Sequence, residues 1–218
     1  DYDPSAPDFE NYMFWYERLF APDWTITDDK YSYLDESNLD GQIADTWQWD
    51  AEAQTFTVTI RDDIYFQTLD AEYDYYGGRN LVAEDVKWSY DRLLGIGSGY
   101  TEPVFCLQDW SATLYMLESV EVTDTYTVVF YFNTNSDVAV SDFMAAAVNI
   151  AGHEWDELSD EQKSDWHYAC GTGPYIVSDY VEGSNMTLVK NENYYDYDER
   201  YRVENKPPPR GKDVNDFL

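Results

Sequence analysis

The fold is decided around residues 55–66, which read Thr55-Phe56-Thr57-Val58-Thr59-Ile60-Arg61-Asp62-Asp63-Ile64-Tyr65-Phe66. Polar and apolar residues alternate with period two from Thr55 to Ile60, which predicts a strand with one buried face. The alternation resumes at Ile64 and Phe66 after an acidic turn.

Residues 83–94 are predicted to form a helix. Acidic residues occupy the first turn, where the helix dipole favours negative charge. Apolar residues recur at helical spacing and share one face. These apolar residues are Val86, Tyr90, Leu93 and Leu94.

Further elements flank this pair. Hydrophobic periodicity predicts helices over 10–20 and 138–148 and strands over 119–123, 126–132, 175–181 and 186–190. The segment Ser159 to Gln162 fits a capping box that opens another helix. Strands and helices mix without strict βαβ alternation, so the expected fold class is mixed α/β, of the α+β kind.

Composition bounds the function. The 218 residues include 44 Asp and Glu against 13 Lys and Arg, a formal net charge of -31. Such a surface is repelled by phosphate backbones and anionic lipids, which excludes nucleic acid and polybasic membrane docking. Hydrophobic residues make up 44%, enough for a core, and the 21 tyrosines suit both cores and wet binding clefts.

The sequence contains no motif typical of an enzyme. We find no phosphate-binding loop, nucleophile elbow or dinucleotide fingerprint. His153 and His167 lie too far apart for a zinc helix, so we expect no metal and no cofactor. Cys106 and Cys170 allow either one disulfide or two free thiols. No stretch reaches the ~18 apolar residues of a membrane span, and a chain that begins at Asp1 is expected to be mature or excised.

Three segments, in order, resemble the family-5 extracellular solute-binding proteins of ABC importers, the oligopeptide, dipeptide and nickel type. The first is the strand and turn of residues 44–66, and the second is the helix Leu81-Val82-Ala83-Glu84-Asp85-Val86-Lys87-Trp88-Ser89-Tyr90-Asp91-Arg92-Leu93-Leu94. The third begins with Gly171-Thr172-Gly173-Pro174-Tyr175 and ends with Asn191-Glu192-Asn193-Tyr194-Tyr195. Asp3-Pro4 and Tyr16–Phe20 resemble the N-terminal region of the family more loosely, and residues 67–80 are longer and more acidic than the corresponding family turn.

The resemblance implies the first lobe of a two-lobed, type II periplasmic-binding-protein-like fold, truncated, because family members are more than twice as long. We expect an N-terminal lobe over 1–205, with a further division into about 1–45 plus 150–205 and about 46–149. The Pro-rich tail over 206–218 is expected to be extended or disordered.

The resemblance also implies function. The parent would be an extracytoplasmic, lipoprotein-anchored receptor that captures short peptides for the permease subunits of an importer, although nickel, heme and sugar ligands remain open. Candidate ligand-binding residues are Phe14, Tyr16, Trp110, Gly171 and Tyr175. A purely structural interpretation places the aromatic residues Phe14, Tyr16 and Tyr175 in the core instead.

Two other classes of protein stay open at this point. A carbohydrate-binding or adhesion module would account for the acidic, aromatic-rich composition, and it predicts a self-contained β-sandwich with a planar strip of Tyr and Trp. A glycosidase predicts two carboxylates facing each other across a cleft.

Overall fold

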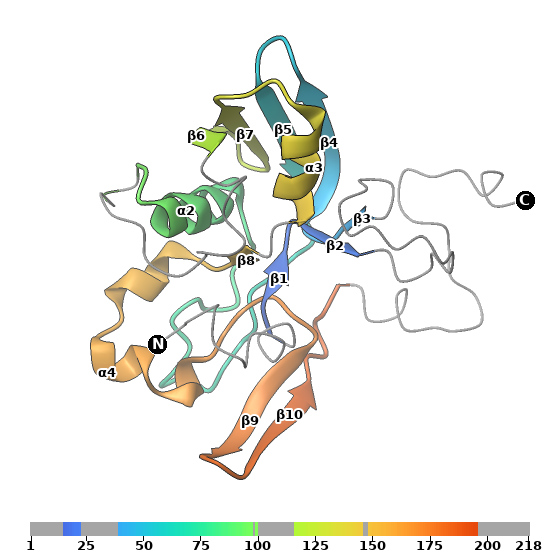
Figure 1. Ribbon diagram of the computed structural model, residues 1–218. Coiled ribbons are helices and arrows are strands. Elements are labelled where there is room, and N and C mark those ends of the chain that lie inside the picture. Colours follow the sequence, from blue (N-terminus) through green and yellow to red (C-terminus); the bar gives the residue numbers. More distant parts are fainter. Residues whose placement is uncertain (1–14, 23–38, 98, 100–115, 146–147, 196–218) are drawn as a thin grey trace, which may run out of the picture.

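The computed structural model describes residues 15–22, 39–97, 99, 116–145 and 148–195 (Figure 1). The candidate residues Phe14 and Trp110, Cys106, and the expected tail over 206–218 lie outside these ranges. The described part contains strands, two longer helices and several short helical turns, so the mixed α/β class is confirmed. The further division into two subdomains stays a prediction.

A four-stranded antiparallel sheet forms one end of the molecule. Its strands are β4 (Ala44–Asp50), β5 (Thr55–Ile60), β6 (Leu117–Asp124) and β7 (Thr127–Phe132), in the order β4-β5-β7-β6. Strand β5 alternates half-buried and buried residues along its whole length, as its sequence predicts. The register places Phe56 opposite Phe130 and Val58 opposite Val128, so the apolar residues of both strands share one face.

Helices α2 (Ala83–Leu94) and α3 (Asp137–Ala145) cover that apolar face. Tyr90 of α2 packs edge-on against Phe130, with ring centroids 4.9 Å apart. Phe143 of α3 contacts Phe56 at 5.9 Å and Phe130 at 4.9 Å. These aromatic side chains are all nearly inaccessible to solvent, so they form the centre of the core.

The ends of α2 follow from its sequence. The Asp85 carboxylate accepts a hydrogen bond from the Val82 amide at 3.0 Å, which satisfies one of the free donors at the start of a helix. Gly95 ends the helix in the left-handed region, with a φ of 66°. The helix therefore occupies the predicted residues 83–94.

The helix expected over 10–20 is wrong for its described part. Residues 17–18 form strand β1 (Glu17–Arg18) and residues 20–22 form strand β2 (Phe20–Pro22). Strand β1 pairs with β8 (Asn149–Ile150), and β2 pairs with β3 (Leu39–Gly41). The apolar spacing of this short segment fits either structure, and pairing with distant strands decides the outcome.

The remaining elements connect the sheet to a second hairpin. They are η3 (His153–Glu157), α4 (Asp160–Lys163), η4 (Trp166–Tyr168), β9 (Tyr175–Val181) and β10 (Asn185–Lys190). The capping box at Ser159 and Gln162 is present at the start of α4. The helix predicted over 138–148 is confirmed as α3 over Asp137–Ala145, and Val148 lies outside it.

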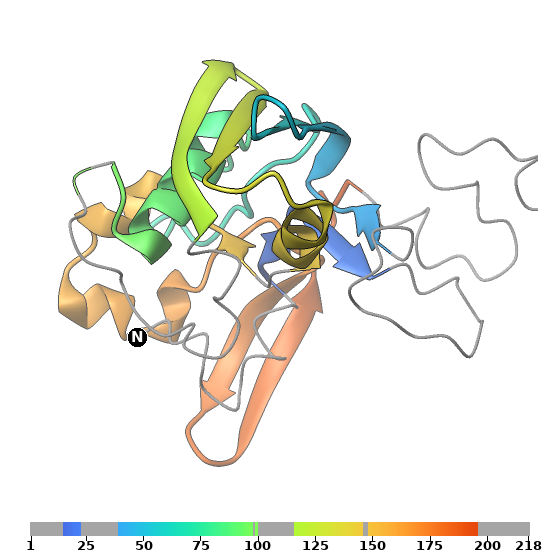
Figure 2. The same ribbon diagram turned by 45° about the horizontal axis from the view of Figure 1, so that its top comes forward.

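Strands β9 and β10 form a two-stranded antiparallel hairpin that projects from the end opposite the four-stranded sheet (Figures 1 and 2). Strands β1 and β8 lie between these two ends. In the part of the chain that the structure describes, sheet and helices share one core, and no second sheet packs face to face on the first. Within these ranges, the β-sandwich required by the carbohydrate-binding alternative is not found.

Candidate functional site

The predicted site residues within the described ranges gather where β1 begins. Tyr16 is buried and lies against Gly171, while Tyr175 is half-buried at the start of β9. We call the contact between residues 15–16, Gln67 and residues 170–175 the glycine junction. It joins segments that lie more than 100 positions apart in the sequence.

Gly171 has no room for a side chain. A Cβ atom placed there would lie 2.0 Å from the Trp15 carbonyl oxygen and 2.8 Å from Cδ1 of Tyr16. Two residues later, the Gly173 amide donates a hydrogen bond to the same Trp15 carbonyl at 2.9 Å. The close backbone approach explains why glycine occupies position 171.

Gln67 is the residue of this junction that sequence reasoning missed. Its Nε2 donates to the carbonyl oxygens of Gly173 at 2.9 Å and Tyr175 at 2.7 Å. Its backbone amide donates to the Gly171 carbonyl at 2.8 Å. The sequence offered one signal for Gln67, which is a polar residue directly after the predicted strand that ends at Phe66. The sequence gives no means of finding the distant hydrogen-bond partners of Gln67.

The contacts of the glycine junction hold the backbone of its three segments together. Cys170 carries a free, fully buried thiol whose Sγ lies 3.3 Å from the Gln67 carbonyl oxygen. Burial raises the pKa of this thiol well above its usual range, so it stays protonated at neutral pH and is a poor nucleophile. The Thr172 hydroxyl is buried without a hydrogen-bond partner among the described residues.

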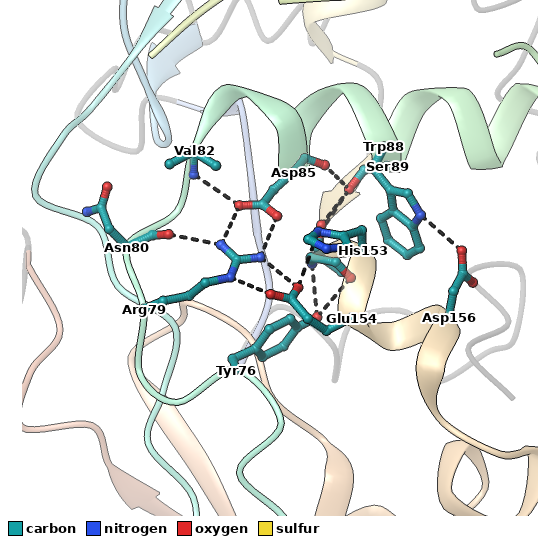
Figure 3. Close-up of polar contacts among 12 residues, drawn as sticks. Tyr76, Arg79, Asn80, Val82, Asp85, Trp88, Ser89, His153, Glu154 and Asp156 are labelled. Atoms are coloured by element: carbon teal, nitrogen blue, oxygen red, sulfur yellow. Dashed lines mark hydrogen bonds and ion pairs between the residues drawn. The ribbon is translucent and has the colours of Figure 1, made fainter. Parts of the chain in front are cut away.

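A second cluster, the Arg79 network, fastens the start of α2 to η3 (Figure 3). The Arg79 guanidinium binds Asp85 through two hydrogen bonds of 2.7 and 2.8 Å and Glu154 through two of 2.6 and 2.7 Å. Asp85 is fully buried, so this bidentate pairing compensates its charge. The Tyr76 hydroxyl, in the same view, accepts from the Gly152 amide at 2.9 Å.

The Arg79 network bears on the question of a metal site. Ligand atoms of Asp85, His153 and Glu154 lie within 4.8 Å of one another, a spacing that could hold an ion. However, Arg79 already occupies both carboxylates with a positive charge. Burial opposes the charged forms of Arg79 and Glu154. Hydrogen bonds from Arg79 to Asp85 and to Glu154 outweigh this effect, so the pKa of Arg79 is raised and that of Glu154 is lowered. The arrangement favours a structural ion pair.

Solved structures share this fold. The oligopeptide-binding protein AppA from Bacillus subtilis, in complex with a nonapeptide, superposes with a TM-score of 0.62 at 20% identity, over 90% of this chain and 34% of that one. NikA from Brucella suis, in complex with Fe(III)-EDTA, gives 0.61 at 16% identity, over 88% and 33%. The chain therefore has the fold of part of a type II periplasmic binding protein.

Sequence comparison supplies the family. Residues 38–212 match the bacterial extracellular solute-binding proteins, family 5, and the chain belongs to this family. It is 23% identical over 184 residues to the probable D,D-dipeptide-binding periplasmic protein DdpA of Escherichia coli (strain K12), covering 79% of this chain and 32% of that protein. It is also 23% identical over 168 residues to heme-binding protein A of Haemophilus influenzae, covering 73% and 30%. The chain thus spans about a third of these relatives, all of which are binding proteins by name.

Proposed function

We propose that this chain is part of the first lobe of the substrate-binding component of an ABC importer, and that the parent protein captures short peptides. The match to family 5 over residues 38–212 is the observation that carries the proposal. The glycine junction is consistent with it, because the contacts there hold backbone rather than activate a nucleophile. Binding proteins of this kind close two lobes over a ligand.

Several finer points belong to the same proposal. The parent acts outside the cytoplasm, is anchored as a lipoprotein, delivers its ligand to permease subunits and performs no catalysis. Among the described residues, no helix is long and apolar enough to cross a membrane. Peptide is the favoured ligand because AppA and DdpA are named for peptide binding, whereas the names of other relatives mention heme.

Tyr175 remains proposed as a ligand-binding residue, together with Phe14 and Trp110. The burial of Tyr16 and the tight fit at Gly171 favour a supporting role for these two residues, in which they position neighbouring segments without contacting the ligand. Tyr175 is half-buried, so its ring is the more accessible of the described candidates.

A thermal-shift screen tests the ligand class. The gene product in its full genomic length is heated with di- to hexapeptides, heme, nickel–histidine or oligosaccharides, since a ligand that binds the folded state raises the unfolding temperature. We expect a shift with peptides. A shift with oligosaccharides and none with peptides would contradict the proposal.

A further inference from the structure

Glu17 carries a buried carboxylate that lies next to the glycine junction but takes no part in the contacts described for it. Only 1% of the residue is accessible to solvent, although it directly follows Trp15 and Tyr16 in the chain. Burying a carboxylate is unfavourable unless hydrogen bonds replace its water. The hydrogen-bond partners of Glu17 therefore indicate which part of the chain the residue holds in place.

Two partners of Glu17 come from the far end of the described chain. The Tyr194 hydroxyl donates to Glu17 Oε1 at 2.9 Å, and the Tyr195 hydroxyl lies 2.8 Å from the same oxygen. The Tyr195 hydroxyl also lies 3.0 Å from the Gln42 carbonyl oxygen. The Arg61 guanidinium stacks 4.1 Å above the Tyr195 ring. We call Glu17, Tyr194 and Tyr195 the Glu17 anchor.

The segment that carries these tyrosines is fixed at its other end as well. Asn191 donates through Nδ2 to the Gly173 carbonyl at 3.0 Å and through its backbone amide to the Pro174 carbonyl at 2.8 Å. Residues 191–195 are thus held to the glycine junction at one end and to β1 at the other. The two attachments lie close to each other, since Gly173 itself binds the carbonyl of Trp15, two residues before Glu17.

We propose that Glu17 is a positioning residue that fixes residues 191–195 in place against β1. A short carboxylate contact to two consecutive tyrosine hydroxyls restrains both ring positions, and the stacked guanidinium restrains one of them further. This inference rests on the proposed function: within one lobe of a binding protein, the anchor keeps residues 191–195 in a fixed place relative to β1.

Distance measurements between spin labels test this positioning. Labels are attached to Glu192→Cys, whose side chain is 75% exposed, and to Glu52→Cys in the exposed turn before β5. Cys106→Ser removes the second native cysteine, and Cys170 is fully buried and stays unlabelled. The double variant Tyr194→Phe/Tyr195→Phe deletes two hydroxyls and keeps both rings. We expect it to widen the distance distribution at least twofold.

Two comparison variants separate positioning from general stability. Glu17→Gln keeps an acceptor oxygen at Oε1, so it should retain the narrow distribution. Tyr131→Phe on β7 deletes an exposed hydrogen bond to the carboxylate of Glu121 on β6 and should leave the distribution unchanged. Amide exchange of β5 should be unaffected in the double variant, because both rings stay in place and the deleted hydroxyls bond to Glu17 and the Gln42 carbonyl, which lie outside the four-stranded sheet.

An unchanged distribution in the double variant would overturn the inference, as would widening accompanied by equally faster exchange of β5. If the double variant does not fold, Tyr194→Phe alone is measured, and an unchanged width in that variant overturns the inference. No ligand enters this experiment, so its failure is distinct from failure of the proposed function.

Discussion

Gly171 is held between two backbone segments, and the fit at this single residue fixes where β1 meets the start of β9. A methyl group would lie 2.0 Å from the Trp15 carbonyl oxygen, a backbone atom that cannot rotate away. The Gly173–Trp15 hydrogen bond depends on the same spacing. Small substitutions here therefore act on the whole junction.

We expect Gly171→Ala to lower the free energy of unfolding by about 3 kcal/mol, since overpacking at a rigid site forces the backbone apart. Urea unfolding followed by tryptophan fluorescence measures the loss. The matched control is Gly183→Ala in the β9–β10 turn, where nothing lies within 4 Å of the new Cβ and only the φ of 69° is unfavourable. That control should cost about 1 kcal/mol. Equal losses in the two variants would show that the contact with Trp15 is unimportant.

Glu154 gives a pH-dependent prediction at the same scale. Its folded-state pKa is lowered by Arg79 from an ordinary value of 4.5, against the opposing effect of burial. The ion pair therefore contributes stability that is fully present above about pH 4.5 and is lost as the pH falls through the lowered pKa. We expect Glu154→Gln to cost about 1–2 kcal/mol at pH 7 and progressively less below pH 4.5. Urea unfolding at several pH values checks this, and a constant difference down to pH 2 would contradict it.

The β9–β10 hairpin exposes large apolar side chains that no other described part of the chain covers. Large apolar side chains are exposed on it, and a two-stranded hairpin without a covering layer is marginally stable in water. These side chains are Tyr180, Val181, Met186 and Val189. Coverage by further parts of the parent protein would account for them.

Val181→Thr/Val189→Thr tests the hairpin surface. Both residues are 46% exposed, so in the 218-residue chain we expect a change of less than about 0.5 kcal/mol in the free energy of unfolding. Self-association, measured by analytical ultracentrifugation, should decrease because exposed apolar edges promote pairing. In the gene product of full genomic length the same variant should cost more than about 1 kcal/mol. A large loss in the 218-residue chain would contradict an uncovered surface.

Elements with strong periodicity could be predicted from the sequence. The alternation of residues 55–60 and the helical spacing of residues 83–94 are each consistent with a single structure, and both were confirmed. The helix over 10–20 was wrong because its apolar residues are used by β1 and β2, whose partners lie far away in the sequence. Gln67 and Glu17 could not have been assigned for the same reason, since their hydrogen-bond partners lie more than 100 positions away.

Across the whole molecule, negative charge is the dominant feature. The formal charge of -31 leaves many carboxylates without a protein cation, since the chain has only 13 Lys and Arg. Self-repulsion destabilises the compact state, and dissolved salt screens it. The Debye length falls from about 30 Å at 0.01 M salt to about 3 Å at 1 M.

We therefore expect the unfolding temperature to rise by roughly 5–10 °C between about 0.01 M and 1 M NaCl, corresponding to about 2–3 kcal/mol for a chain of this size. Differential scanning calorimetry measures the shift. Potassium chloride should act equally, and replacing exposed Glu52, Asp179 and Glu182 with lysine should reduce the dependence on salt. An unfolding temperature that is flat or falls with salt would rule out self-repulsion as a major destabilising effect.

The central claim is that this chain is one part of a family-5 binding protein whose ligand site needs the remaining polypeptide. Isothermal titration calorimetry with short peptides tests it most directly, comparing the 218-residue chain with the gene product of full genomic length. We predict micromolar or tighter peptide binding by the full-length product and weak or no binding by the 218-residue chain. Micromolar binding by the 218 residues alone, or no peptide binding by either protein, would contradict the claim.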